Sequence, residues 1–215
     1  YRDSAAKATN KQSLFPLGGL LKRDVRALAR KYELPTAEKS ESMGLCFVGE
    51  RGTRRHGFGE FLSEYVQGVE GDICAPDGTS LGRHRGLHLY TIGQRARLSG
   101  KPERFFVARK EPATNRLIVV PGSTHPMLQC TALDTEAFQW IASDGSASLH
   151  DAQNLQAQVR YQQDAVPCRV QLQGGGIRVH FDEPVTAVAM GQVVALYNGD
   201  VCLGSGVIDH AETLA

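Results

Sequence analysis

The 215 residues are 41% hydrophobic and 22% charged, with a formal net charge of +1, and no apolar run is long enough to cross a bilayer as a helix. The five cysteines are scattered without a C-x-x-C pair, which argues against a disulfide framework or a zinc site and favours a reducing compartment. We expect two modules, and a longer parent protein because the chain opens on Tyr1 rather than Met.

Charge is unevenly distributed along the chain. Residues 83–110 carry eight Lys or Arg against a single acid, Glu103, whereas residues 121–215 carry three basic and ten acidic side chains. A basic middle next to an acidic tail module predicts a polyanionic partner, since each phosphate contact releases counterions. From the count alone, a solvated surface with uneven charge explains the pattern equally well.

The first half of the chain predicts short helices around one strand. "GGLLKRDVRALARKYELP" predicts an amphipathic helix that Pro35 ends. Its apolar positions share one face, which is expected to be core: Leu21, Val25, Leu28, Ala29 and Tyr32. "GLCFVG" predicts a strand, and "FGEFLSEYV" predicts a short packed helix through its apolar spacing at Phe58, Phe61, Leu62 and Tyr65.

After Gly71 the apolar pattern changes to period two. "RFFVARKEPATNRLIVVPG" predicts two strands joined by a turn through Pro112 and Asn115. "CRVQLQGGGIRVHF" and "VVALYNGDVCLGSGVI" predict two further hairpins, which turn at residues 174–176 and at Asn198-Gly199. Short strands with regular turns from about residue 123 onward predict a small antiparallel barrel or sandwich.

Other motifs offer little chemistry. "LQGGGIR" lies between two alternating strands rather than before a helix, which favours a hairpin turn over a phosphate loop. The seven histidines show no H-E-x-x-H spacing, so no metal site is predicted. The "GSG" of residues 204–206 lies in a late strand, where small residues indicate a bulge.

Cys46 is the cysteine whose neighbours suit a reactive thiol. Most cysteines are small buried hydrophobes, and a reactive one needs nearby cations and access. Lys39, Arg51, Arg54 and Arg55 lie close to it in sequence, and Gly44 and Gly49 on either side of it let the backbone bend. The remaining cysteines lack such a cluster or fall in strand patterns and are expected to be structural: Cys74, Cys130, Cys168 and Cys202.

Three segments resemble the tRNA-specific 2-thiouridylases, which convert the wobble uridine of certain tRNAs to 2-thiouridine. "FPLGGLLKRDVRALARKYELPTAEKSESMGLCFVGERG" is similar to the segment with the family's second catalytic cysteine. "LGRHRGLHLYTIGQR" resembles the signature L-G-x-H-x-G-x-x-x-Y-T-x-G-Q-R, and "RFFVARKEPATNRLIVVPGSTHPML" resembles the hairpin before the last domain. The resemblance runs from about Leu14 to Ile208, and "ESMGLCFVG" is spelled more like the mitochondrial branch than the bacterial one.

The resemblance implies an architecture. Residues 1–50 would be the end of the adenylating catalytic domain, residues 51–122 a central tRNA-binding domain and residues 123–215 a carboxy-terminal β-barrel. The expected fold class is α+β, mainly β, with a small helical and β-hairpin central domain followed by a small antiparallel β-barrel.

The resemblance also implies a reaction. The family binds ATP with Mg²⁺ through an S-G-G-x-D-S loop, activates the C2 oxygen of uracil as an adenylate and transfers sulfur from a cysteine persulfide, a position that maps onto Cys46. The loop and the family's other cysteine are absent from the sequence. ATP is therefore expected on a missing amino-terminal domain, and this chain is expected to be inactive alone.

The implied partners are a tRNA and a sulfur donor. The donor of persulfide sulfur would be a sulfur-relay protein or a cysteine desulfurase, and the location mitochondrial, or cytoplasmic for a bacterial protein. The tRNA would be held by its anticodon arm, through these expected contacts: Arg51, Arg54, Arg55, Arg83, Arg85, Tyr90, Gln94, Arg95, Arg97 and Lys101. Gly93 and Gln94 are equally well explained as residues that only shape a domain junction.

Two other classes of function remain open. A small barrel with a basic neighbour is a common way to hold RNA, so the chain is also compatible with a non-catalytic RNA-binding module. A thiol-dependent hydrolase would need His56 or another histidine beside Cys46, and no sequence feature places one there.

Overall fold

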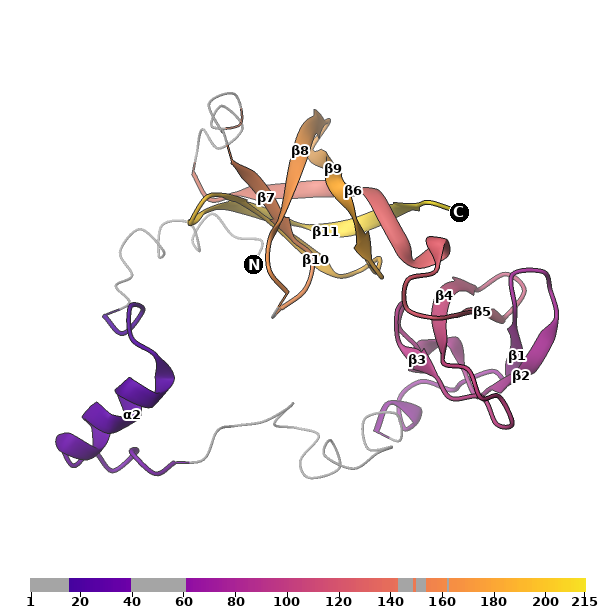
Figure 1. Cartoon of the computed structure of the whole chain (residues 1–215), viewed down its shortest axis with the longest axis horizontal. Coiled ribbons are helices and arrows are strands. Elements are labelled where there is room, and N and C mark those ends of the chain that lie inside the picture. Colours follow the sequence, from indigo (N-terminus) through magenta and orange to yellow (C-terminus); the bar gives the residue numbers. More distant parts are fainter. Residues whose placement is uncertain (1–15, 40–60, 143–148, 150–153, 162) are drawn as a thin grey trace. The chain divides into compact units, whose positions relative to one another are not determined.

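The computed structural model describes residues 16–39, 61–142, 149, 154–161 and 163–215. The chain divides into two compact units, Tyr1–Val66 and Gln67–Ala215 (Figure 1). Within the described residues no helix combines the length and apolar character that crossing a membrane would need. The mainly β, α+β class expected from the sequence is confirmed.

The described part of the first unit is built around helix α2, Lys22–Lys31, which confirms the predicted helix. Asp24 in its first turn and Arg30 and Lys31 in its last turn complement the helix dipole. The helix ends at Lys31 with Tyr32 as its C-cap, and the next residue, Glu33, takes a left-handed φ of 53° before Pro35 prevents further helix. The Arg30 guanidinium donates to Glu38 at 2.7 Å, which ties the following turn back to the helix.

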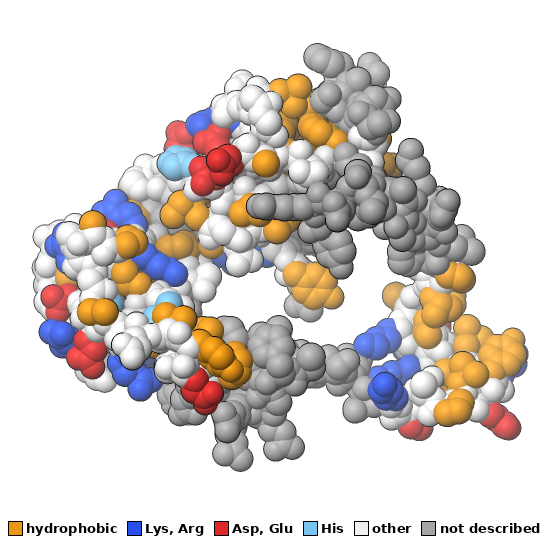
Figure 2. Space-filling view, turned by 180° about the vertical axis from the view of Figure 1, so that it is seen from behind, with side chains coloured by type: hydrophobic (Ala, Val, Ile, Leu, Met, Phe, Trp, Pro, Cys, Tyr) orange, Lys and Arg blue, Asp and Glu red, His pale blue; other side chains and the backbone are white. Residues whose placement is uncertain are grey.

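The apolar face of α2 is not core in this structure. No residue of the helix is buried, and Leu21 and Tyr32 at its ends are 59% and 66% exposed. Figure 2 shows hydrophobic side chains gathered on this surface. The expectation that this face packs in a core is therefore wrong for the described structure, because amphipathic spacing predicts which face is apolar but not what covers it.

The second predicted helix is a short turn where it can be followed. Residues 61–63 are helical, and the amides of Tyr65 and Val66 donate to the Leu62 carbonyl. The rings of Phe61 and Tyr65 lie 5.1 Å apart, in line with their predicted common face. Phe58 and the "GLCFVG" strand lie outside the described residues.

The second unit begins with a five-stranded sheet. Its strands are β1 (Gly71–Cys74), β2 (Ser80–His84), β3 (Arg95–Ala96), β4 (Phe105–Glu111) and β5 (Arg116–Pro121), arranged in the order β2-β1-β5-β4-β3. β1 runs parallel to β5, and the other neighbours are antiparallel. The predicted β4–β5 hairpin is confirmed, with Asn115 in its turn at a φ of 50°.

The core of the sheet follows from its strand order. β4 buries Phe105 and Val107 by alternation, whereas residues 117–120 of β5 are all buried because this central strand is covered on both faces. On one face of β5, Leu117 and Val119 pack with Ile73 and Ala96. The other contributes Val120 to a separate cluster with Leu128 and Ala187.

A closed antiparallel barrel follows. Its strands are β6 (Gln129–Trp140), β7 (Leu155–Gln158), β8 (Val166–Gln173), β9 (Gly176–Thr186), β10 (Val193–Asn198) and β11 (Val201–Thr213), closing in the order β10-β11-β6-β9-β8-β7. The short 3-10 helix η3, Pro126–Leu128, precedes β6 and carries Leu128 into the cluster shared with the sheet. Inward residues of all six strands fill the interior, Leu133, Ala157, Cys168, Val179, Leu196 and Ile208 among them.

The predicted hairpins of the barrel are confirmed. β8 and β9 pair up to Gln173 and Gly176, so the turn itself is Gly174-Gly175 and the third glycine belongs to the strand. β10 and β11 turn at Gly199 with a φ of 56°. The predicted bulge is also present, because the pairing of β11 with β6 shifts between Gly206 and Ile208.

Candidate nucleic-acid interface

Part of the expected site lies outside the described residues. This applies to the proposed sulfur carrier, Cys46, and to three of the expected tRNA contacts, Arg51, Arg54 and Arg55. It also applies to His56, which a thiol hydrolase would require. Their assigned roles therefore stay predictions, and the interface is built from the other seven tRNA contacts.

Two arginines on the sheet are paired with acids of the same sheet. Arg83 on β2 lies opposite Asp72 in the register, 3.7 Å from its carboxylate, and 3.9 Å from Glu70. Arg109 on β4 contacts Glu111 at 2.9 Å. Hydrogen bonding from Thr114 first, and then the neighbouring arginines, lowers the pKa of Glu111. These local pairs reduce the charge that Arg83 and Arg109 offer to a polyanion.

A second group of cations lies along β3 and the loop that follows it. Within the described part of the chain none of them forms an ion pair with an acid, and all are exposed. Arg95 on β3 and Arg97 directly after it are exposed, whereas Ala96 between them is buried. We call this group the β3-edge cations: Arg95, Arg97, Lys101 and Arg104. Figure 2 shows Lys and Arg side chains spread over the surface of the sheet.

His84 shows that the signature segment also maintains the fold. Its ring is 1% exposed; Nδ1 accepts the Gly86 amide at 3.1 Å, and Nε2 donates to the Asn115 carbonyl at 3.1 Å, an assignment that follows from the partners. The Asn115 side chain in turn donates to the Glu70 carbonyl at 2.9 Å. His84 thereby fixes the end of β2 to the β4–β5 turn and to the start of β1.

Tyr90 and Gln94 also make contacts inside the sheet. Tyr90 is half-buried and packs on the core with its ring edge-on to His84, and burial raises its pKa against an opposing effect of Arg85. The Gln94 side-chain oxygen accepts the Thr91 amide at 2.9 Å and so closes the turn. Their contacts with RNA stay predictions. Arg85, directly after His84, is exposed.

Gly93 brings the sheet and the barrel together. It has a left-handed φ of 80°, its amide donates to the Val107 carbonyl at 2.7 Å, and a Cβ at this position would collide with the Cβ of Ala187. The same hypothetical Cβ would lie 3.2 Å from an Nη atom of Arg160, which donates a hydrogen bond to the Ala187 carbonyl. Gly93 therefore shapes the junction, as one of the two sequence interpretations expected.

The barrel contributes two residues that sequence reasoning missed, Arg160 and Tyr161. They lie in the connection after β7, and Tyr161 is 93% exposed. An Arg-Tyr pair in a loop of an otherwise acidic module was the available signal. Its proximity to Gly93 could not be deduced, because the two segments are distant in sequence.

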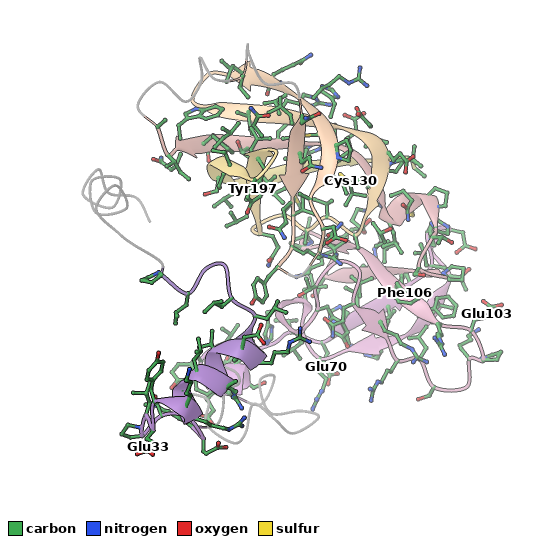
Figure 3. All side chains as sticks on the ribbon, turned by 60° about the vertical axis from the view of Figure 1, so that its left-hand side comes forward. Glu33, Glu70, Glu103, Phe106, Cys130 and Tyr197 are labelled. Carbon is green, nitrogen blue, oxygen red and sulfur yellow. The ribbon has the colours of Figure 1, made fainter. Side chains whose placement is uncertain are left out.

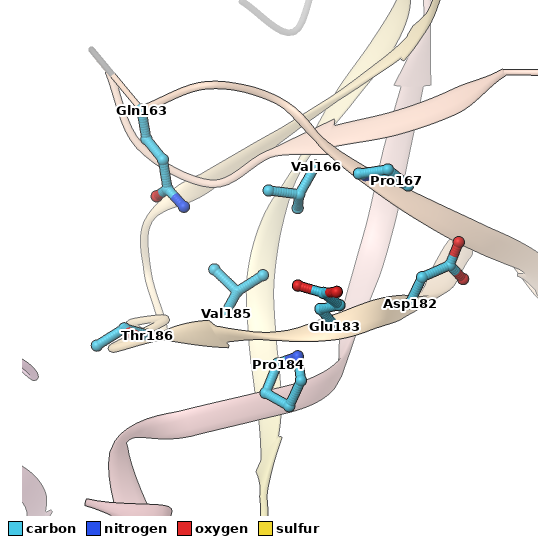
Figure 4. A pocket seen from close by; sticks show the side chains of 8 residues that line it. All are labelled: Gln163, Val166, Pro167, Asp182, Glu183, Pro184, Val185 and Thr186. Carbon is cyan, nitrogen blue, oxygen red and sulfur yellow. The ribbon is translucent and has the colours of Figure 1, made fainter. Parts of the chain in front are cut away.

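The barrel also holds a cavity of about 540 Å³ that none of the predicted residues lines. It opens where β8 and β9 separate, since their pairing stops at Cys168 and Phe181. The Glu183 carboxylate lies between Val166 and Pro184 in this cavity, with Asp182 at its rim (Figure 4). These two carboxylates make it an unsuitable site for phosphate.

The four described cysteines are free thiols, and three of them are buried. Burial raises the pKa of Cys130, within the barrel (Figure 3), to about 11 and that of Cys168 to about 12. Such thiols hold almost no thiolate at neutral pH, which agrees with a structural role. Across the described ranges no group of three or more His, Cys, Asp or Glu is arranged to hold a metal ion.

The described geometry thus defines a protein with an exposed row of cations on a sheet that is joined to an acidic barrel. Family models cover the same chain in three consecutive parts. Residues 4–50 match the tRNA methyl transferase HUP domain, residues 59–121 the tRNA methyl transferase PRC-barrel domain and residues 130–208 the aminomethyltransferase β-barrel domain.

Curated relatives are named tRNA-specific 2-thiouridylase MnmA. The chain is 43% identical over 212 residues to that of Chromohalobacter salexigens, 42% identical over 207 residues to that of Pseudomonas fluorescens and 40% identical over 207 residues to that of Vibrio vulnificus. These alignments cover 92–94% of this chain and 53% of each relative. The chain is therefore a homologue of the tRNA-specific 2-thiouridylases, and it spans about half the length of the curated relatives it matches.

Proposed function

We propose that the chain is the carboxy-terminal part of an enzyme that converts the wobble uridine of tRNA to 2-thiouridine. The observation that carries this proposal is the 43% identity to a tRNA-specific 2-thiouridylase across 94% of the chain. The three consecutive domain matches support the division into residues 1–50, 51–122 and 123–215. The mitochondrial location stays a prediction; the relatives reported above are bacterial proteins.

In the proposed reaction Cys46 carries a persulfide. A persulfide is a strong nucleophile at neutral pH, so its terminal sulfur attacks C2 of the adenylated uridine, the C2–oxygen bond breaks and AMP leaves with that oxygen. A second thiol then attacks the Cys46 sulfur, which leaves sulfur on C2 and joins the two cysteines in a disulfide that a thiol reductant reopens. Cationic neighbours in the sequence, Arg51 among them, would favour the ionised form of the carrier.

The residues of this chain do not fit an ATP site of the kind that the resemblance implies. No S-G-G-x-D-S loop occurs in the sequence, and the described residues present no group of acids for Mg²⁺. Activation of the uridine would therefore belong to a part of the protein outside this chain. The sulfur-relay or desulfurase donor would also be a separate protein.

We assign the sheet and its junction with the barrel to tRNA binding. The β3-edge cations are exposed and have no acidic partner in the described residues, so their charge remains available to the phosphates of the anticodon arm. Arg83 and Arg85, on and just beyond β2 at the other end of the strand order, would add further contacts. The acidic cavity and the excess of acids on the barrel limit RNA contact there to a few loops.

The deciding experiment measures 2-thiouridine in tRNA digests after the full-length protein reacts with ATP and a persulfide donor. In the Cys46→Ser variant we expect thiolation to be lost while tRNA affinity and adenylate formation persist. Cys202→Ser is the matched control, because Cys202 is partly accessible and lies on a strand of the barrel. Undiminished thiolation by Cys46→Ser would favour the alternative, a non-catalytic RNA-binding barrel module.

A further inference from the structure

We propose that Tyr161 is a stacking platform for an unpaired base of the bound RNA, an inference that rests on the proposed tRNA function. At 93% exposure Tyr161 has the most exposed large hydrophobic side chain in the described part of the chain. Single-stranded RNA is recognised largely by stacking of splayed bases on aromatic rings. An exposed ring next to a cation is a suitable surface for such a base.

The loop that carries Tyr161 is held at both ends. The amide of Gln163 donates to the Arg160 carbonyl at 3.3 Å, which links the chain on the two sides of Tyr161. The Gln158 side chain on β7 donates to the Gln163 carbonyl at 2.6 Å and accepts from the Tyr197 hydroxyl at 3.3 Å. The loop is thereby tied to β7 and β10, so little conformational freedom is lost when a base binds.

Arg160 differs from the other two arginines of the barrel module. Arg178 contacts Asp134 at 2.8 Å and Arg169 lies 3.4 Å from Asp182, so the charge of each is compensated locally. Arg160 has no acidic partner in the described residues and instead donates to the Ala187 carbonyl. The uncompensated cation of the barrel is thus the residue directly before Tyr161.

The same loop lies beside the sheet. The Arg160 guanidinium would be 3.2 Å from a Cβ on Gly93, and Arg95 follows two residues later on β3. In the register Arg95 lies opposite Phe106, whose ring packs in the cluster shared with the barrel. The junction therefore combines an exposed aromatic ring with cations from both modules, which is what a base and its flanking phosphates require.

The test uses the full-length protein and an unmodified anticodon stem-loop RNA with a wobble uridine, with affinity measured by fluorescence anisotropy. We expect Tyr161→Ala and Tyr161→Leu to weaken binding about 5-fold or more, and Tyr161→Phe to bind within about 2-fold of wild type, because stacking needs the ring and not the hydroxyl. Leu172→Ala removes an exposed apolar side chain elsewhere on the barrel and is the control, expected to have no effect.

Salt dependence and a fluorescent base separate stacking from charge. Tyr161→Ala is expected to leave the slope of log affinity against log salt unchanged, since no phosphate contact is lost. With 2-aminopurine placed at each loop position in turn, one position is expected to be quenched by wild type and by Tyr161→Phe but not by Tyr161→Ala. Salt-dependent binding by wild type with equal affinity for Tyr161→Ala would overturn the platform alone. No RNA binding by wild type would overturn both the platform and the proposed function.

Discussion

His84 and the arginines on either side of it show how one strand serves two purposes. The alternation of β2 turns His84 into the interior, where both ring nitrogens are hydrogen-bonded, while Arg83 and Arg85 remain exposed. The signature segment therefore combines residues that build the sheet with residues available to RNA. The sequence of the signature alone does not distinguish the structural residues from the RNA-binding ones, because both kinds belong to the same motif.

The buried thiols lead to a prediction about pH. With pKa values of about 11 and 12, Cys130 and Cys168 hold roughly one-thousandth and one ten-thousandth of their thiol as thiolate at pH 8. We expect iodoacetamide at pH 8 to leave both unmodified in the folded protein, as measured by peptide mass spectrometry. Full modification in denaturant is the control, and modification of the folded protein at the denatured rate would contradict the burial.

The same pKa values predict how stability responds to alkali. Both thiols ionise at higher pH in the folded state than in the unfolded chain, where the ordinary value is 9.0. Their contribution to the free energy of unfolding is therefore complete below about pH 9 and is lost as pH rises towards 11 and 12. Because folding raises the pKa of both thiols, these groups destabilise the barrel in alkali and not in mild acid.

At the scale of elements, strands were easier to predict than their partners. The run "RLIVVP" clearly predicts a strand, and β5 is indeed buried along residues 117–120. Its parallel pairing with β1 was not predicted, because residues 71–74 are too few to show a period and lie far from β5 in sequence. The β1–β2 hairpin did leave a signal, the turn residues Asp77 and Gly78, the latter at a φ of 89°.

Gly93 supports a prediction about the element that joins sheet and barrel. Gly93→Ala must place a Cβ against Ala187 and adopt a left-handed φ, so we expect it to lower the free energy of unfolding by about 2–4 kcal/mol. Urea unfolding of the full-length protein measures the loss. Ala187→Gly in the same chain removes the opposing Cβ and is expected to recover part of the loss. The recovery is measured against Ala187→Gly alone, because Ala187 has a left-handed φ of 58° that glycine also relieves.

Gly100→Ala is the matched control for this experiment. Gly100 also has a left-handed φ, of 73°, but nothing lies within 4 Å of its hypothetical Cβ. This variant retains the backbone strain without the collision and is expected to lose only about 1 kcal/mol. Equal losses at Gly93 and Gly100 would show that the junction contact is not tight.

For the whole molecule, the distribution of charge matters more than the net value. The sequence is close to neutral overall, yet residues 83–110 carry eight Lys or Arg against one acid, whereas residues 121–215 carry three against ten. The β3-edge cations are all exposed, so their charge is accessible to a ligand in solution. RNA affinity should therefore depend on the edge cations and not on the total charge.

Salt titrations of tRNA binding test this distribution. Replacing Arg95 and Arg97 with Gln is expected to lower the slope of log affinity against log salt by about 0.7–0.9 for each lost phosphate contact. The same change at Arg83 and Arg109 is expected to have a smaller effect, because their charges are already paired with Asp72 and Glu111. Equal effects at all four positions would contradict a localised interface.

The sequence by itself determined the elements and the resemblance. Helical spacing of apolar residues before Pro35 predicted α2, and alternation with turn residues predicted the barrel hairpins. Such signals depend only on neighbours within a few residues, so the sequence shows them directly. Only the tertiary structure decided that Gly93 meets Ala187 and that Arg160 lies beside them, since contacts between distant segments depend on strand order and register. It also decided that the apolar face of α2 is uncovered in the described structure, because spacing shows which face is apolar and not what packs against it.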